Sequence, residues 1–178
     1  MRQGEVLGLA WEDVNLDQRT ARVRQALQYR PGEGLLLVPP KTARSRRTVP
    51  LSDQLVQALK LRREAQDLDR AAAGEFWEEW GLVFTTSLGT PVGPRNDYRD
   101  FRRLLVQAGL RQVRLHDLRH TAASLMLAAG VNPRVVMEVL GHSQIGVTMN
   151  LYSHVAPNVS RAAVEGVAGL LGDQDGEA

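Results

Sequence analysis

The hydrophobic pattern changes its period partway along the chain, and this change most constrains the fold. From Thr20 to Gln28 apolar and polar residues alternate, as in a strand with one solvated face. Leu35 to Val38 and Arg47 to Leu51 predict two further strands. After Ser52 the apolar spacing becomes helical. We therefore expect an α+β fold, mostly helical, with one small antiparallel sheet near the N-terminus.

Capping and stop signals bound the expected helices. Ser52 or Asp53 offers a side-chain oxygen to the free amides at the start of a helix that runs to about Arg70. The Asn132-Pro133 start and the Gly141 stop predict a short helix between them. Further helices are expected over residues 98–108, 116–129 and 159–171. The 178 residues suffice for one compact core.

Composition excludes several classes of protein. The chain has no cysteine, so disulfides, zinc–thiolate sites and cysteine nucleophiles are excluded. Its N-terminus does not have the pattern of a signal peptide, and its apolar runs are too short for a membrane helix. These features indicate a soluble, cytoplasmic protein.

Positive charge is clustered, although the formal net charge is only +2. Basic residues gather from Lys41 to Arg47 and again from Arg111 to His120, whereas acidic residues gather from Glu64 to Glu79 and at the C-terminus. This asymmetry favours one basic surface that faces nucleic acid.

Two short stretches contain residues suited to chemistry at an anion. His116 and Arg119 share a helix face, so the imidazole and the guanidinium could bind one phosphate together. A surface histidine beside an arginine paired with Asp117 is the alternative. Tyr152 follows His142 by ten residues and is either a nucleophile or a core aromatic residue. The other two tyrosines are expected to be core residues.

The arrangement of these residues resembles the catalytic domain of the tyrosine recombinases, the phage-integrase family. The resemblance extends over nearly the whole chain, up to about Pro157. Its motifs are Arg2-Gln3-Gly4-Glu5, Trp11-Glu12-Asp13-Val14, Pro40-Lys41-Thr42, Gly89-Thr90-Pro91, His116-Asp117-Leu118-Arg119, Leu140-Gly141-His142 and Tyr152-Ser153-His154-Val155. Taken singly, Arg2 could be a solvated terminal residue, Lys41 a turn charge and His142 a cation at a helix end.

The resemblance implies a site-specific DNA recombinase (an integrase) that acts through a 3′-phosphotyrosyl intermediate without metal or cofactor. Tyr152 would be the nucleophile, His116 its general base, and Lys41 the acid for the departing 5′-oxygen. The residues expected to bind the scissile phosphate are Arg2, Arg119 and His142, with Glu5 in a supporting role. The residues expected to track the DNA backbone are Arg44, Arg46, Arg47 and Arg114.

The resemblance also predicts the domain organisation and the partners. Residues 1–157 would form the catalytic domain, and residues 158–178 a C-terminal helix followed by an acidic tail. The family's first catalytic helices and its core-binding domain are expected to be absent, because Arg2 lies so close to the start, and this truncated chain is expected to be weak or inert. Double-stranded DNA is the expected partner, with self-assembly through the C-terminal helix, in the bacterial nucleoid of a host that carries a mobile element.

Two other functions fit the sequence. The first is a non-catalytic DNA-binding remnant, because the helices on either side of Gly130 resemble a helix-turn-helix. The second is strand cleavage of the type IB topoisomerase kind, which shares the phosphotyrosyl chemistry. The Leu140-Gly141-His142 motif favours the recombinase.

Overall fold

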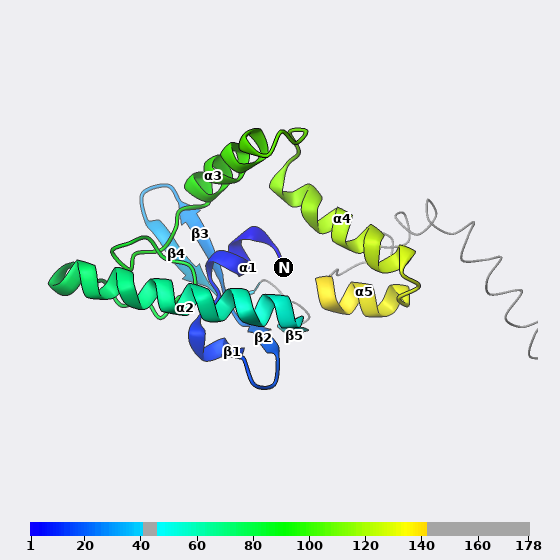
Figure 1. Cartoon of the computed structure of the whole chain (residues 1–178), viewed down its shortest axis with the longest axis horizontal. Helices are drawn as coiled ribbons and strands as arrows, with labels where there is room; N and C mark the ends of the chain where they lie inside the picture. Colours follow the sequence, from blue (N-terminus) through cyan, green and yellow to red (C-terminus); the bar gives the residue numbers. More distant parts are fainter. Residues whose placement is uncertain (41–45, 142–178) are drawn as a thin grey trace, which may run out of the picture. The chain divides into compact units, whose positions relative to one another are not determined.

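The computed structural model describes residues 1–40 and 46–141, which divide between two compact units (Figure 1). The units cover Met1–Asp117 and Leu118–Ala178. The strands are β1 (Val14–Asn15), β2 (Thr20–Val23), β3 (Ala26–Arg30), β4 (Gly34–Val38) and β5 (Arg47–Pro50). The helices are α1 (Gln3–Leu7), η1 (Trp11–Asp13), α2 (Asp53–Ala73), η3 (Gly74–Phe76), α3 (Pro94–Gln107), α4 (Leu115–Ala128) and α5 (Pro133–Leu140). None of these helices is both long and apolar enough to cross a membrane.

The expected α+β, mostly helical fold is confirmed, but the strands form two antiparallel sheets instead of one. One sheet has the order β1-β2-β5 and the other pairs β3 with β4. The single strand predicted from Thr20 to Gln28 is interrupted at Arg24 and Gln25. Arg24 Nη1 donates to Asp13 Oδ1 at 3.1 Å, and Gln25 Nε2 donates to the Gly8 carbonyl at 2.9 Å. These contacts turn the chain from one sheet into the other.

Helix α1 lies directly against β3 because Gly4 within the helix and Gly8 at its C-cap have no side chain. A Cβ atom on Gly4 would meet the carbonyl oxygen of Leu27 at 2.7 Å, and one on Gly8 would meet the Leu27 amide nitrogen at 2.7 Å. Both distances are too short for a side chain, so the close approach requires glycine. The same helix carries Glu5 and begins immediately after Arg2. Its packing on β3 therefore fixes the backbone of both residues.

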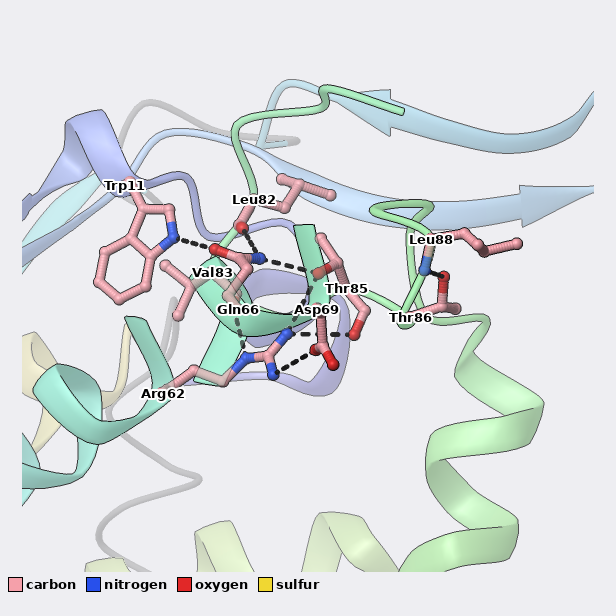
Figure 2. Close-up of polar contacts among 9 residues, drawn as sticks. All are labelled: Trp11, Arg62, Gln66, Asp69, Leu82, Val83, Thr85, Thr86 and Leu88. Atoms are coloured by element: carbon pink, nitrogen blue, oxygen red, sulfur yellow. Dashed lines mark hydrogen bonds and ion pairs between the residues drawn. The ribbon is translucent and has the colours of Figure 1, made fainter. Parts of the chain in front are cut away.

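Figure 2 shows a polar network between α2 and the extended segment that runs from Leu82 to Thr85. Gln66 is buried and donates from Nε2 to the Leu82 carbonyl at 3.0 Å and to Thr85 Oγ1 at 2.8 Å. Trp11 Nε1 donates to Gln66 Oε1 at 2.6 Å. Arg62 adds bonds from the same helix to this segment. The network fixes the segment and η1 to α2, around a core of Leu9, Ala21, Leu59 and Val83.

Local signals correctly located several helix ends. Ser52 is the N-cap of α2, and its Oγ accepts a hydrogen bond from the Leu55 amide at 3.4 Å. Helix α5 has the predicted bounds: Asn132 Oδ1 accepts from the Arg134 amide at 2.9 Å, and Gly141 ends the helix with φ 69°. Helices α4 and α5 pack through Ala123, Leu127, Val136 and Leu140. This pair forms the core of the described part of the second unit.

Candidate functional site: an arginine–carboxylate cluster and the α4–α5 pair

The residues of the first motif form a cluster at the start of α1. Arg2 is the N-cap, and its amide donates to Glu5 Oε2 at 2.7 Å while its Nη1 donates to Glu5 Oε1 at 2.9 Å. The Glu5 side chain is only 6% exposed, whereas that of Arg2 is 43% exposed. The carboxylate thus binds both the amide and the guanidinium of Arg2, whose side chain remains partly exposed.

Arg47 was expected to track the DNA backbone from the start of a strand, but the structure buries its side chain against the same carboxylate. Arg47 Nη2 lies 2.7 Å from Glu5 Oε2, and Nη1 lies 3.2 Å from Oε1. Burial of the Glu5 carboxyl favours its neutral form, but the hydrogen bonds from Arg47 and Arg2 outweigh this effect and lower the pKa of Glu5 to about 2. Glu5 is therefore ionised at neutral pH.

The His-x-x-Arg motif occupies the first turns of α4, as expected. His116 is exposed and Arg119 is buried. Arg114 precedes the helix, and its amide donates to Asp117 Oδ2 at 3.0 Å. Its guanidinium also bonds to Asp117, which raises the pKa of the fully exposed Arg114. The carboxylate expected as an alternative partner of Arg119 therefore accepts from Arg114 and caps the helix.

The buried guanidinium of Arg119 reaches the end of α5. Its Nη2 donates to the carbonyl of Leu140, the last residue of that helix. The last carbonyls of a helix have no partner within it, and a cationic side chain is a favourable donor to them. The contact fixes Arg119 at the C-terminal end of α5.

Four of the expected site residues lie outside the described residues: Lys41, Arg44, His142 and Tyr152. The expected C-terminal helix over residues 159–171 lies there too. Arg46 is exposed and lines a polar pocket of about 230 Å³ with Glu12, Asp13, Arg24 and Gln25. Within residues 1–40 and 46–141, no three histidine or acidic side chains gather as a metal site.

Sequence reasoning missed a basic face on α3. A shallow depression of about 550 Å³ on this helix is lined by Arg95, Tyr98, Arg99, Arg102, Arg103, Val106 and Gln107. The expectation that Tyr98 and Tyr29 are core residues was wrong, because they are 38% and 65% exposed. The signal was present: these arginines recur at spacings of three and four, which place them on one helical face. Four arginines on α3 outnumber its two aspartates.

Comparison with known proteins identifies the family. The model of the phage integrase family matches residues 1–158. The chain is 35% identical to a XerC-like tyrosine recombinase of Caldanaerobacter subterraneus over 93% of this chain and 45% of that protein. It is 32% identical to an integrase of Saccharopolyspora erythraea over 89% of this chain and 48% of that protein. This chain therefore belongs to the phage integrase family, the tyrosine recombinases, as its motifs indicated.

Solved structures agree on the fold. The integrase of the Tn1549 transposon, in complex with transposon right end DNA, matches with a TM-score of 0.79 at 24% identity, over 94% of this chain and 55% of that chain. The XerA recombinase matches with a TM-score of 0.65 at 25% identity, over 91% of this chain and 51% of that chain. The chain spans about half the length of the curated relatives it matches.

Proposed function

We propose that this chain is the catalytic part of a site-specific DNA recombinase that cuts and rejoins DNA strands through a 3′-phosphotyrosyl intermediate. The observation that carries the proposal is that both arginines assigned to the scissile phosphate have defined anchors. Glu5 holds Arg2, and the end of α5 accepts from Arg119. Fixed guanidinium donors stabilise the charge that develops on nonbridging oxygens when a phosphodiester is attacked, without reorganising during the reaction.

The remaining roles follow from the chemistry of each side chain. The Tyr152 hydroxyl attacks phosphorus, and its proton passes to His116, because a phenol with a pKa near 10 is mostly protonated at neutral pH. The bond to the 5′-oxygen breaks, and Lys41 protonates that oxygen. His142 donates a further hydrogen bond to the phosphate. The 5′-hydroxyl of a second strand then attacks the phosphotyrosyl bond and releases Tyr152.

The domain organisation and assembly form part of the same proposal. Residues 1–157 make up the catalytic domain, and the helix expected over residues 159–171 packs on a neighbouring copy when several copies assemble on DNA. Such a protein acts on chromosomal and mobile-element DNA in the nucleoid.

Covalent trapping tests the proposed function. The chain is incubated with a nicked suicide duplex, from which the short fragment that carries the new 5′-hydroxyl diffuses away, and a denaturing gel is expected to show a protein–DNA adduct. A version extended at its N-terminus serves as the comparison. Binding without an adduct from either version would favour the non-catalytic DNA-binding remnant, for which the succession of α4 and α5 is the supporting observation. Relaxation of supercoiled DNA without strand exchange would favour the topoisomerase.

The basic face of α3 is proposed to contact the DNA backbone. Replacing Arg95, Arg99 and Arg102 together by glutamine is expected to weaken binding about 10- to 100-fold at moderate salt. The slope of log K against log salt concentration should fall by about 0.9 for each phosphate that the variant no longer neutralises. Fluorescence anisotropy at several salt concentrations measures both quantities.

The control for this experiment is Arg70→Gln, because Arg70 is an exposed arginine on α2 that pairs with Glu79. Its salt slope should equal that of the unmodified chain. An unchanged slope for the triple variant would contradict the assignment of α3 to DNA.

A further inference from the structure

The carboxylate of Glu5 accepts hydrogen bonds from two different guanidinium groups. Oε1 lies 2.9 Å from Arg2 Nη1 and 3.2 Å from Arg47 Nη1. Oε2 lies 2.7 Å from the Arg2 amide and 2.7 Å from Arg47 Nη2. An ionised carboxylate offers about four acceptor sites, and these four bonds use them. The three residues therefore form one hydrogen-bonded unit around Glu5.

The two arginines of this unit differ in exposure. The Arg47 side chain is 7% exposed and that of Arg2 is 43% exposed. Arg47 makes the two parallel bonds of a guanidinium fork, which fixes the orientation of the carboxylate. The guanidinium of Arg2 contacts the carboxylate through Nη1. Arg47 is thus placed to fix the carboxylate, and Arg2 to receive a ligand.

The charges of the unit explain why a second arginine is useful. Arg2 and Glu5 alone would form a neutral pair, which attracts a phosphate only weakly. The charge of Arg47 offsets that of Glu5, so the three residues together carry one net positive charge, and the exposed group among them is Arg2. The lowered pKa of Glu5 is consistent with this balance, because the carboxylate stays ionised beside two cations.

The position of Arg47 is fixed by the fold and not by its neighbours in the sequence. It is the first residue of β5, where it pairs with Val23 of β2. Glu5 lies on α1, which packs on β3. The ion pair therefore connects the end of the three-stranded sheet to the helix that carries the first motif.

We propose that Arg47 is a positioning residue for Arg2 that acts by offsetting the charge of the Glu5 carboxylate, so that Arg2 stays attractive to a phosphate, and that Arg47 itself does not contact DNA. This inference rests on the proposed function for its catalytic part. Its DNA-binding part is independent, because the number of cations that meet phosphates can be measured without any reaction.

The first arm of the test measures binding to an unmodified duplex as a function of salt. The double variant Glu5→Gln with Arg47→Gln, in which Arg2 keeps its charge, is compared in the full chain with Arg46→Gln. Arg46 is exposed, so Arg46→Gln should lower the salt slope by about 0.9, whereas the double variant should leave it unchanged. A decrease of the same size in both variants would overturn the proposal.

The second arm uses the rate of adduct formation on the suicide duplex. Arg47→Gln should lower this rate about 10- to 100-fold, because the unopposed carboxylate then neutralises Arg2. The double variant Glu5→Gln with Arg47→Gln should recover at least about tenfold relative to Arg47→Gln, since Arg2 is no longer neutralised. If Arg47 had only a structural role, the double variant would be no faster than Arg47→Gln, and that result would overturn the proposal.

The double variant also guards against misfolding. Arg47→Gln alone leaves a buried carboxylate without its main partner and could unfold, whereas two neutral amides can hydrogen-bond to each other. If Arg47→Gln does not fold, the salt slope and adduct rate of the double variant are compared with those of the unmodified chain. A slope lower by about 0.9 counts against the proposal, and an unchanged slope supports it. The absence of adducts from the unmodified chain would count against the proposed function and leave the salt slope to decide the role of Arg47.

Discussion

Replacing Tyr152 by phenylalanine is expected to abolish the covalent protein–DNA adduct and to leave DNA affinity nearly unchanged. The substitution removes only the hydroxyl that attacks phosphorus, and loss of a nucleophile typically lowers the rate by more than about 10³-fold. The rate of adduct formation on the suicide duplex and the affinity for an uncleaved duplex are measured on the same preparation.

Tyr29→Phe is the matched control for this variant. Tyr29 lies on β3, its side chain is largely exposed, and it has no role in the proposed reaction. Its adduct rate should equal that of the unmodified chain. An adduct that persists in Tyr152→Phe would show that another residue is the nucleophile.

Replacing Arg119 by alanine is expected to slow adduct formation about 10²- to 10³-fold. Removing one fixed donor to a developing oxyanion costs about 2.7–4 kcal/mol in well-studied enzymes. The rate of adduct formation by Arg119→Lys should lie between those of the unmodified chain and Arg119→Ala, because lysine keeps the charge but not the planar fork. Single-turnover rates at saturating DNA separate this effect on the reaction from any effect on affinity.

The same substitution also removes the donor to the Leu140 carbonyl, so stability has to be measured in parallel. Loss of that bond is expected to lower the free energy of unfolding by about 1–3 kcal/mol. Arg134→Ala provides a control on α5, since Arg134 is exposed and pairs with Glu138 on the same helix. An Arg119→Ala variant that remains folded and cleaves at the normal rate would contradict the assigned role.

The parts of the fold that were predictable depend on local chemistry. The bounds of α5 follow from a capping asparagine, a proline at the first helical position and a terminal glycine, all within one short segment. The start of α3 was predicted at Tyr98, but the helix begins at Pro94. Gly93 and Pro94 are typical of a turn, although a proline is equally suited to the first turn of a helix.

The features that were missed depend on contacts between distant residues. The break between β2 and β3 is stabilised by Gln25, which bonds to Gly8 across 17 residues of sequence. The partner of Arg47 is Glu5, which lies 42 residues away. Neither pairing leaves a periodic signal, so the sequence suggested an exposed Arg47 within a basic run.

The same distinction holds for the candidate site: its residue types were predictable from the sequence, whereas the contacts that anchor them were not. The motifs identified the residue types, and the family match to residues 1–158 confirms the family. The anchors of those residues came only from the structure: the shared carboxylate of Glu5 in the first unit, and the Leu140 carbonyl beside Arg119 in the second. The catalytic roles assigned to these residues remain predictions.

The most direct test of the central claim is to identify the residue that carries the DNA. After reaction with the suicide duplex, the adduct is digested with protease and nuclease, and the modified peptide is sequenced by mass spectrometry. A tyrosine recombinase requires a nucleotide 3′-phosphate on Tyr152. Attachment to Tyr29 or Tyr98, or to a serine, would contradict the account.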